Sequence, residues 1–160
     1  MRLREMTESE YSSYLERFYV EYAGEQVKAG SWPADRAIEL AKAEIKELMP
    51  DGLATKDQYL YSLIVTGEPT PVGFIWLMIR KRNGCKEAFI DDIEIYENFR
   101  RKGYAVQALD ELDVIAKEMG IHKIRLHVFA HNHRARELYE KCGYKTVSYT
   151  HLTLPTTPYV

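Results

Sequence analysis

The sequence has little of what marks a secreted, membrane-spanning or nucleic-acid-binding protein. Its two cysteines, Cys85 and Cys142, lie far apart and lack the spacing of metal ligands. No apolar run approaches the roughly 20 residues of a membrane-spanning helix, and residues 1–5 are too polar to open a signal peptide. Basic and acidic side chains nearly balance, at 22 against 24, which gives no general attraction to nucleic acid or anionic membranes. We therefore expect a cytoplasmic protein with free thiols and with neither a nucleic-acid nor a membrane partner.

The sequence does contain a regular succession of extended and helical patterns over its 160 residues, a length that can bury a core without disulfides. Strands are expected at 3–6, 59–65, 72–79, 88–96 and 123–129, and the last strand starts at 145. Helices are expected after the Thr7-Glu8-Ser9-Glu10 capping box, from Pro33, from Gly103 to Met119, and after Asn132, with the polar stretch between Gly24 and Gly30 connecting the first two. The order β-α-α-β-β-β-α-β-α-β predicts a single α/β (α+β) domain with a mixed, mostly antiparallel central sheet and helices on both faces.

The most informative stretch is the loop Arg100-x-x-Gly103-x-Ala105, which leads from an apolar strand directly into the third helix. The first N–H groups of a helix lack internal partners and lie at the positive end of its dipole, so such a corner binds anions, above all phosphate. Gly103 lets a ligand approach the backbone closely. The alternative is a solvated basic turn. The dinucleotide and P-loop glycine fingerprints are absent, which disfavours a Rossmann or NTPase site.

A second pattern follows about 25 residues further on, and its spacing relative to the loop is more specific than either pattern alone. It reads Asn132-x-x-Ala135-x-x-Leu138-Tyr139-x-x-x-Gly143-Tyr144. With both patterns, the sequence resembles the Gcn5-related N-acetyltransferase (GNAT) family over residues 59–144. The N-terminal third resembles a little-characterised bacterial subgroup of that family.

The resemblance implies that acetyl-coenzyme A is the acyl donor. The pyrophosphate would bind the amides of residues 101–105, and the pantetheine arm would pair with the edge of the fourth strand, which in the family splays from the fifth. Asn132 matches a residue that contacts the pantetheine arm, although helix capping alone would explain it. The implied cofactor-binding residues are Ile93, Glu94, Ile95, Arg100, Arg101, Lys102, Gly103, Tyr104, Ala105 and Asn132.

The resemblance also assigns Tyr139 as the general acid that protonates the departing coenzyme A thiolate; the alternative is a core aromatic. The amine must lose a proton, and Asp91, Asp92 and Glu94 are candidate bases because they stand on the strand beside the reacting carbonyl. Carboxylates on a central strand are costly unless they are paired or used. Strand alternation sends Asp91 and Asp92 to opposite faces, so we expect one of them to reach the site.

The resemblance implies an enzyme, an N-acetyltransferase. Because no cysteine occupies a nucleophile position in these motifs, we expect the amine to attack directly, without a covalent enzyme intermediate. The histidines at 122, 127, 131 and 133 fit no standard zinc spacing, and we expect no metal. Two rivals remain: a noncatalytic acyl-coenzyme A sensor of the same fold, and a nucleic-acid-binding module built on the cations at 100–102, 134 and 136.

The resemblance implies that the amine acceptor binds at the first two helices and their connection, which here span residues 19–32. Tyr19, Glu21, Tyr22 and Glu25 could receive a cationic amine, but they could equally be core tyrosines and a solvated acidic face. A polyamine, an antibiotic, an amino acid and a protein N-terminus all remain open as acceptors. A homodimer is also compatible with the sequence.

The end of the sequence departs from the rest. Residues 146–160 contain no Asp, Glu, Lys or Arg, although a charged fraction of 29% predicts about four. Residues 147–157 resemble the conceptual translation of a transposase-type sequencing adapter. We therefore expect an N-acetyltransferase domain at 1–146 and a non-native tail at 147–160, within which 148–154 could still pair as an edge strand.

Overall fold

The computed structural model describes residues 1–128, 132–145 and 152–155. It divides into a helical unit, Met6–Gln58, and a sheet unit, which combines Met1–Glu5 with Tyr59–Val160. The elements are, in chain order, β1 (Arg2–Glu5), α1 (Glu8–Lys28), α2 (Ala37–Leu48), β2 (Gln58–Ile64), β3 (Gly73–Arg82), β4 (Cys85–Ile95), α3 (Tyr104–Glu118), β5 (Ile121–Val128), α4 (His133–Lys141) and β6 (Leu152–Pro155), with short 3₁₀ turns at Gly52–Ala54 and Glu97–Phe99. This order confirms the predicted succession of strands and helices.

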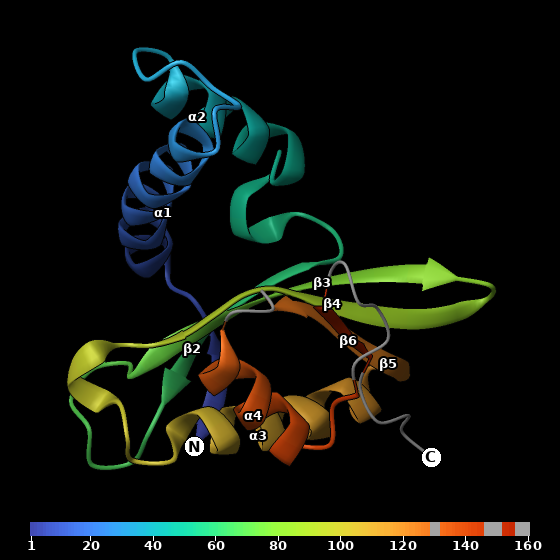
Figure 1. Ribbon diagram of the computed structural model, residues 1–160. Helices are drawn as coiled ribbons and strands as arrows, with labels where there is room; N and C mark the ends of the chain where they lie inside the picture. The colour runs from blue at the N-terminus through green and yellow to red at the C-terminus, as the bar shows by residue number, and fades with distance from the viewer. Residues whose placement is uncertain (129–131, 146–151, 156–160) are drawn as a thin grey trace. The chain divides into compact units, whose positions relative to one another are not determined.

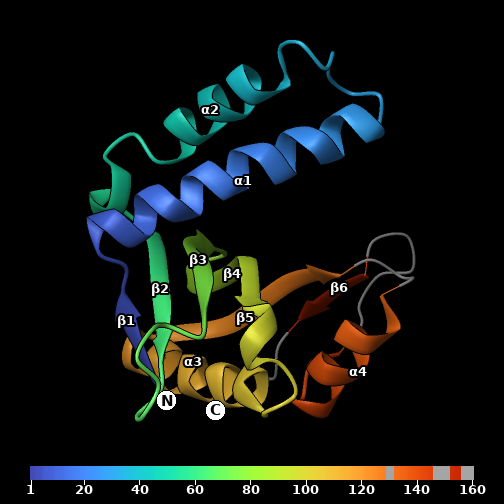
Figure 2. The same ribbon diagram turned by 90° about the vertical axis from the view of Figure 1, so that its left-hand side faces the viewer.

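The helical unit is formed by α1 and α2, which lie side by side (Figure 2). The predicted capping box starts α1: the Glu10 N–H donates to Thr7 Oγ1 over 3.1 Å, and the Thr7 N–H donates to the Glu10 carboxylate over 3.0 Å. Both donors would otherwise lack partners, so the box fixes where the helix begins.

Two boundaries in the helical unit differ from the prediction. α1 runs through Gly24 to Lys28, because one glycine costs a helix only about 1 kcal/mol relative to alanine and packing on both sides of it outweighs that cost. α2 starts at Ala37 rather than at Pro33. Pro33 instead opens a turn, in which its carbonyl accepts a hydrogen bond from the Arg36 N–H over 3.2 Å.

Within the described residues, the sheet has six strands in the order β1-β2-β3-β4-β5-β6. β1 is antiparallel to β2, β3 to β4, and β5 to β6, whereas β4 and β5 are parallel. The β3–β4 hairpin turns at Asn83-Gly84, where both residues have positive φ, at 53° and 78°. The parallel pair requires a crossover, and α3 supplies it.

β4 carries an irregularity and then separates from β5. Trp76 lies opposite Asp92, but the next residue of β3, Leu77, lies opposite Ile90, so Asp91 is an extra residue in a β-bulge. On the other side, the ladder to β5 ends where Ile90 lies opposite Leu126. Beyond that point, the ladders within the described residues join β4 to β3 alone, which is the predicted splay.

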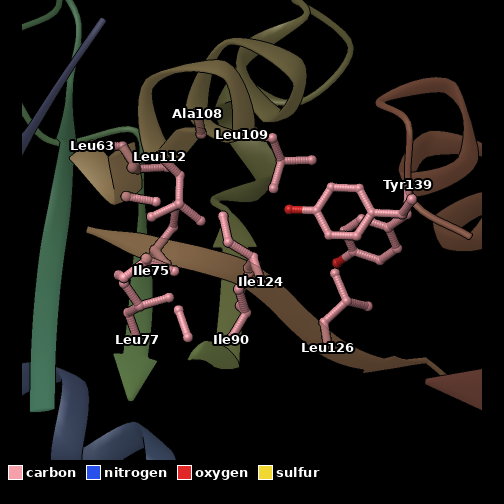
Figure 3. Close-up of a cluster of buried hydrophobic side chains, with 14 of the residues drawn as sticks. Leu63, Ile75, Leu77, Ile90, Ala108, Leu109, Leu112, Ile124, Leu126 and Tyr139 are labelled. Carbon is pink, nitrogen blue, oxygen red and sulfur yellow. The ribbon is translucent and has the colours of Figure 1, made fainter. Parts of the chain in front are cut away.

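The core of the sheet unit lies between the sheet and α3, with α4 beside it (Figure 1). Figure 3 shows α3 presenting Ala108, Leu109 and Leu112 to the sheet. Gly73, at the start of β3, allows β3 to approach β4 closely, because a Cβ at this position would clash with the Glu94 carbonyl oxygen. The segment of β4 after the bulge is thereby held against β3.

Part of the unusual C-terminal segment joins the sheet. β6 pairs antiparallel with β5, with Leu152 opposite Val128 and Pro155 opposite Arg125. The predicted edge strand at 148–154 is thus observed from residue 152, and residues 148–151 lie outside the described residues. Thr146 and Val147, which were predicted to open the last native strand, also lie outside them.

Candidate active site

The start of α3 has the geometry expected of an anion-binding corner. Arg101 and Gly103 have positive φ values of 65° and 81°, so the backbone turns sharply before Tyr104 opens the helix. In the part of the chain that the structure describes, no side chain caps this helix, and its first turn has no acidic residue. Its first N–H groups are therefore available to an anionic ligand.

Arg100, which the motif predicts to bind the cofactor, makes contacts with the end of β4. Its Nε donates a hydrogen bond to the Ile95 carbonyl over 2.8 Å, and its guanidinium lies 3.6 Å from the Glu94 carboxylate. Arg100 thus fastens the loop to the end of β4. The Glu94 carboxylate therefore offsets part of its positive charge.

Lys102 lies outside the cavity that the other loop residues line. Its ammonium lies 3.8 Å from Glu68, in the β2–β3 connection, and 5.8 Å from the Phe99 ring centroid. The Tyr104 hydroxyl donates to the same Glu68 carboxylate over 3.2 Å. Glu68 therefore supports the loop, a role that the sequence analysis missed, because nothing in its spacing relates it to the motif.

A cavity of about 600 Å³ opens in front of this corner. It is bounded by the end of β4, by the loop and first turn of α3, and by one side of α4. Its lining residues are Ile93, Glu94, Ile95, Phe99, Arg100, Arg101, Gly103, Tyr104, Ala105, Val106, Asn132, Arg134, Ala135, Glu137, Leu138 and Lys141. Of the ten predicted cofactor-binding residues, all but Lys102 meet here.

A smaller cavity of about 170 Å³ lies next to the larger one and shares Ile93, Asn132 and Ala135 with it. It is lined by Ile90, Asp91, Asp92, Ile93, Leu126, His127, Val128, Asn132, Ala135 and Tyr139. The three predicted catalytic residues are thus gathered around one space. Both aspartates line it, which differs from the expectation that one would, because the bulge interrupts the alternation of side chains at Asp91.

Desolvation and the neighbouring Asp92 perturb the Asp91 carboxyl. Asp91 is exposed, yet it lies in a concavity where the surrounding protein displaces water; this desolvation and then the Asp92 charge raise its pKa to about 7, against a smaller lowering by Arg80. Arg80 in turn lies 3.9 Å from Glu87, which is buried. A carboxyl with a pKa near neutrality is suited to exchanging protons.

Tyr139 is buried at the C-terminal end of α4. Burial, followed by the charge of Asp92, raises its pKa to about 12, so the phenol stays protonated at neutral pH. The helix end fixes its position: the Tyr144 N–H donates to the Tyr139 carbonyl over 3.0 Å, and the Gly143 N–H donates to the Glu140 carbonyl over 3.0 Å. The Tyr139 and Tyr144 rings pack with their centroids 5.7 Å apart. This is a Schellman motif with its hydrophobic contact.

Asn132 has a structural role in addition to its place between the cavities. Its side-chain oxygen accepts a hydrogen bond from the Ala135 N–H over 3.2 Å, which caps α4. Capping therefore explains an asparagine at this position without a ligand.

The residues predicted for the amine acceptor make contacts within the helical unit. The Tyr22 hydroxyl donates to Glu44 over 2.7 Å, and its ring meets Trp32 edge to face at 5.4 Å. The Lys42 ammonium lies 5.7 Å from the Tyr19 ring centroid, and Glu21 lies 3.9 Å from Arg17. These contacts support the structural interpretation of part of this set.

Two further searches cover the described residues only. Among residues 1–128, 132–145 and 152–155, no group of three His, Cys, Asp or Glu side chains is arranged to hold a metal ion. In the same ranges, no helix is both long enough and apolar enough to cross a membrane.

A mixed sheet that splays after a bulge, with an anion-binding helix start beside the splay, defines an acetyltransferase of the GNAT type. The sequence pattern of the Acetyltransferase (GNAT) family matches residues 11–144, so the chain belongs to this family and is an acyltransferase. The predictions of family, enzyme class and fold class are confirmed.

Individual relatives agree with this assignment. The N-acetyltransferase YycN of Bacillus subtilis (strain 168) is 45% identical over 143 residues, which cover 89% of this chain and 91% of that protein. The N-acetyltransferase YdgE of the same organism is 34% identical over 142 residues, 89% of this chain and 90% of that protein. The crystal structure of YycN superposes with a TM-score of 0.79 at 42% identity and covers 92% of this chain and 94% of that chain.

A more distant structure shares the fold. The PaiA N-acetyltransferase of Thermoplasma acidophilum, solved in complex with coenzyme A, has a TM-score of 0.67 at 17% identity and covers 98% of both chains. At this level of identity, the likeness supports the fold assignment.

Proposed function

We propose that the protein transfers an acetyl group from acetyl-coenzyme A directly to an amine. The observation that carries this proposal is the pair of adjoining cavities: the larger one combines an anion-binding helix start with the edge of β4, and the smaller one holds two carboxylates and a buried phenol. The nucleotide end of the cosubstrate would occupy the larger cavity and its thioester the smaller. We also place the reaction in the cytoplasm, where acetyl-coenzyme A is available.

The chain's own residues suit the two ends of the cosubstrate. The amides of residues 101–105 would hold the pyrophosphate, since they lie at the positive end of the α3 dipole. The pantetheine arm carries amides, which can pair with the backbone of Ile93 and Ile95 where β5 no longer lies alongside. Arg100 joins these two parts through its hydrogen bond to the Ile95 carbonyl.

Asp91 would accept the proton that the amine must lose. The amine nitrogen attacks the thioester carbonyl carbon, the new C–N bond forms as the C–S bond breaks, and the amine proton passes to the Asp91 carboxylate directly or through water. A pKa of about 7 leaves Asp91 a competent base at neutral pH. Asp92, which also lines the cavity, would act by keeping this pKa high.

Tyr139 would serve as the general acid toward the departing sulfur. With a pKa of about 12 it is protonated throughout the physiological range, and it can donate to the thiolate as charge develops on it. Because a thiol has a pKa of about 8.5, complete transfer from Tyr139 is uphill, and its main contribution would be hydrogen bonding in the transition state.

The acceptor is proposed to be a primary amine, presented as the free base when it attacks. Glu25 and the tyrosines of α1 could attract its ammonium form, as the sequence suggests, although Tyr22 and Glu21 already have partners. A polyamine, an amino acid, an aminoglycoside-type antibiotic and a peptide N-terminus form the panel to test.

The first test is thiol release from acetyl-coenzyme A with each member of this panel. We expect Tyr139→Phe to lower kcat by about 10²-fold or more with little change in acetyl-coenzyme A affinity, since general acid–base groups contribute 10²–10⁴. Binding of acetyl-coenzyme A without turnover of any amine would support the noncatalytic sensor instead.

Binding is tested separately by the thermal shift that acetyl-coenzyme A produces. Gly103→Glu places a carboxylate in the anion-binding corner, so we expect the shift to disappear. Gly103→Ala is the matched control for charge: it bears the same backbone strain at a φ of 81° and adds a Cβ that meets no protein atom within 4 Å, but it adds no carboxylate, so it should retain more of the shift than Gly103→Glu. Equal loss in both variants would contradict the anion-binding role of this corner.

A further inference from the structure

The larger cavity carries two positive charges that the proposed pyrophosphate site does not use. Arg134 and Lys141 line the cavity from α4, and both are exposed. In the ranges that the structure describes, neither has a carboxylate within ion-pair distance. The remaining segments, 129–131, 146–151 and 156–160, contain no Asp or Glu in their sequence.

Three other cations near the site, Arg100, Lys102 and Arg136, differ in this respect. Arg101, which also lines the cavity without an ion pair in the described ranges, belongs to the proposed pyrophosphate loop. Arg100 lies 3.6 Å from Glu94, and Lys102 lies 3.8 Å from Glu68. On α4 itself, Arg136 lies 3.9 Å from Glu140 and does not line the cavity. The sequence analysis grouped positions 134 and 136 among the cations of the rival nucleic-acid-binding module, and the structure separates them, because only Arg134 lines the cavity.

The two sides of α4 face different parts of the site. Asn132 and Ala135 line both cavities and Tyr139 only the smaller one, whereas Arg134 and Lys141 line only the larger. With a helical rise of about 1.5 Å per residue, Arg134 and Lys141 start about 10 Å apart along the helix, and their long side chains can converge on one group between them. They therefore face the end of the cosubstrate that is remote from the thioester.

Coenzyme A carries a phosphomonoester on its ribose 3′ oxygen, separate from its pyrophosphate. We propose that Arg134 and Lys141 bind this 3′-phosphate and make the enzyme prefer coenzyme A to 3′-dephospho-coenzyme A. The inference rests on the proposed function, because it takes the nucleotide end of acetyl-coenzyme A to lie in the larger cavity. A phosphomonoester carries about −1.5 to −2 charges at neutral pH, which matches two cations.

Substitution of Glu137 should have the opposite effect on the preference for coenzyme A from substitution of the two cations. It lines the same cavity, three residues after Arg134 and four before Lys141, so it is their neighbour on the helix surface. Its carboxylate would repel the 3′-phosphate. Glu137→Gln should therefore strengthen the preference that the two cations create.

The experiment measures the affinities of coenzyme A and 3′-dephospho-coenzyme A by calorimetry, for the wild type and for single variants of the full chain. We expect the wild type to bind coenzyme A about tenfold tighter or more, the ratio that about 1.4 kcal/mol provides. Arg134→Gln and Lys141→Gln should each lower coenzyme A affinity several-fold and leave dephospho-coenzyme A affinity unchanged. Glu137→Gln should raise the ratio.

Lys145→Gln is the matched control, because it removes the same charge from an exposed side chain four residues after Lys141 that lines neither cavity. It should leave the ratio unchanged. Equal wild-type affinity for both ligands, or an equal loss of both in Arg134→Gln and Lys141→Gln, would overturn the phosphate subsite and leave the proposed function standing. Binding of neither ligand would overturn both.

Discussion

At the scale of single residues, Asp91 combines exposure to solvent with a raised pKa. Its position as the extra residue of the β4 bulge brings it beside Asp92 in the smaller cavity. Desolvation in this concavity comes first among the causes of the shift, and the neighbouring charge second. The same arrangement that makes Asp91 basic enough to accept a proton therefore makes its charged form unfavourable.

The pH dependence of the reaction follows from this residue. The pH profile of kcat/KM should have a limb that rises with pH and has its midpoint near pH 7, because only ionised Asp91 can accept the amine proton. We expect Asp91→Asn to remove this limb and lower kcat/KM about 10²-fold or more. In Asp92→Asn the limb should persist but move to lower pH, because the charge that raises the Asp91 pKa is gone. A limb that is unchanged in Asp91→Asn would assign it to another group.

The stability of the fold should decrease as the pH rises, whereas the reaction rate should increase. Because folding raises the pKa of Asp91 from about 4, folding carries no cost from this group below about pH 4, and the cost grows as the pH rises and is complete above about pH 7. Asp91→Asn removes the charge, so its melting temperature should exceed that of the wild type at about pH 8 and approach it at about pH 4.5. Melting curves at the two pH values, at constant ionic strength, measure this difference.

The candidate catalytic residues could be predicted from the sequence, but their surroundings could not. Tyr139 and the two aspartates were marked by their motifs and by the cost of acids on a central strand. That both aspartates line one cavity depends on the bulge, and the sequence does carry a signal for it: the core-side apolar positions change from Ala88 and Ile90 to Ile93 and Ile95, from even to odd. Glu68 had no such signal.

At the scale of elements, α4 is short, and its C-terminal end carries the proposed acid. The Schellman motif requires Gly143 to adopt a φ of 95° so that the Tyr144 N–H reaches the Tyr139 carbonyl. The ring of Tyr144 then packs against that of Tyr139. Helix termination and placement of the phenol are therefore the same structural event.

A pair of glycine substitutions tests this connection. Gly143→Ala should destabilise the protein by about 1 kcal/mol, because alanine is strained at positive φ, and should also lower kcat as Tyr139 loses its fixed position. Gly24→Ala, in the interior of α1 where a Cβ meets no atom within 4 Å, should instead stabilise by about 0.5–1 kcal/mol and leave kcat unchanged. Chemical denaturation measures the free energy of unfolding of both variants, and thiol-release kinetics measure kcat. A change opposite to the expected one in either variant would contradict the prediction.

Element ends were predictable where a side chain or a glycine determines them locally. The Thr7 capping box and the helix start after Asn132 were found as expected, and the Asn83-Gly84 turn and the helix end at Gly143 follow the same local rule. The predictions at Gly24 and Pro33 were wrong, because the cost of one glycine in a helix is smaller than the packing energy of α1, and because a proline fits a preceding turn as well as a first helical turn.

At the scale of the whole molecule, the family match ends before the unusual C-terminal segment, and so does the described lining of the site. The match covers residues 11–144, and among the described residues the last one that lines either cavity is Lys141. β6 nevertheless pairs with β5, so part of this segment completes the edge of the sheet. We keep the proposal that residues 1–146 are the N-acetyltransferase domain and residues 147–160 a foreign tail.

A chain that ends at Thr146 tests this division. It should retain coenzyme A affinity, because the described residues that line both cavities precede residue 146, and it should melt at a lower temperature, because β5 loses its partner strand. Calorimetry with coenzyme A and circular dichroism measure the two effects. Loss of binding in a truncated chain that still folds would show that the tail belongs to the working domain, and sequencing of the source DNA across Val147 checks its origin.

The bulge in β4 also separates what the fold needs from what the reaction needs. Without Asp91, Ile90 and Asp92 would still face Leu77 and Trp76, and every apolar side chain of β4 would keep its place in the core. The shorter strand would be straighter, since bulges add bend and twist, and it could continue beside β5 over the stretch where the cosubstrate is proposed to lie. The extra residue Asp91 therefore lies where the pairing of β4 with β5 ends, and it also supplies one of the carboxylates that line the smaller cavity.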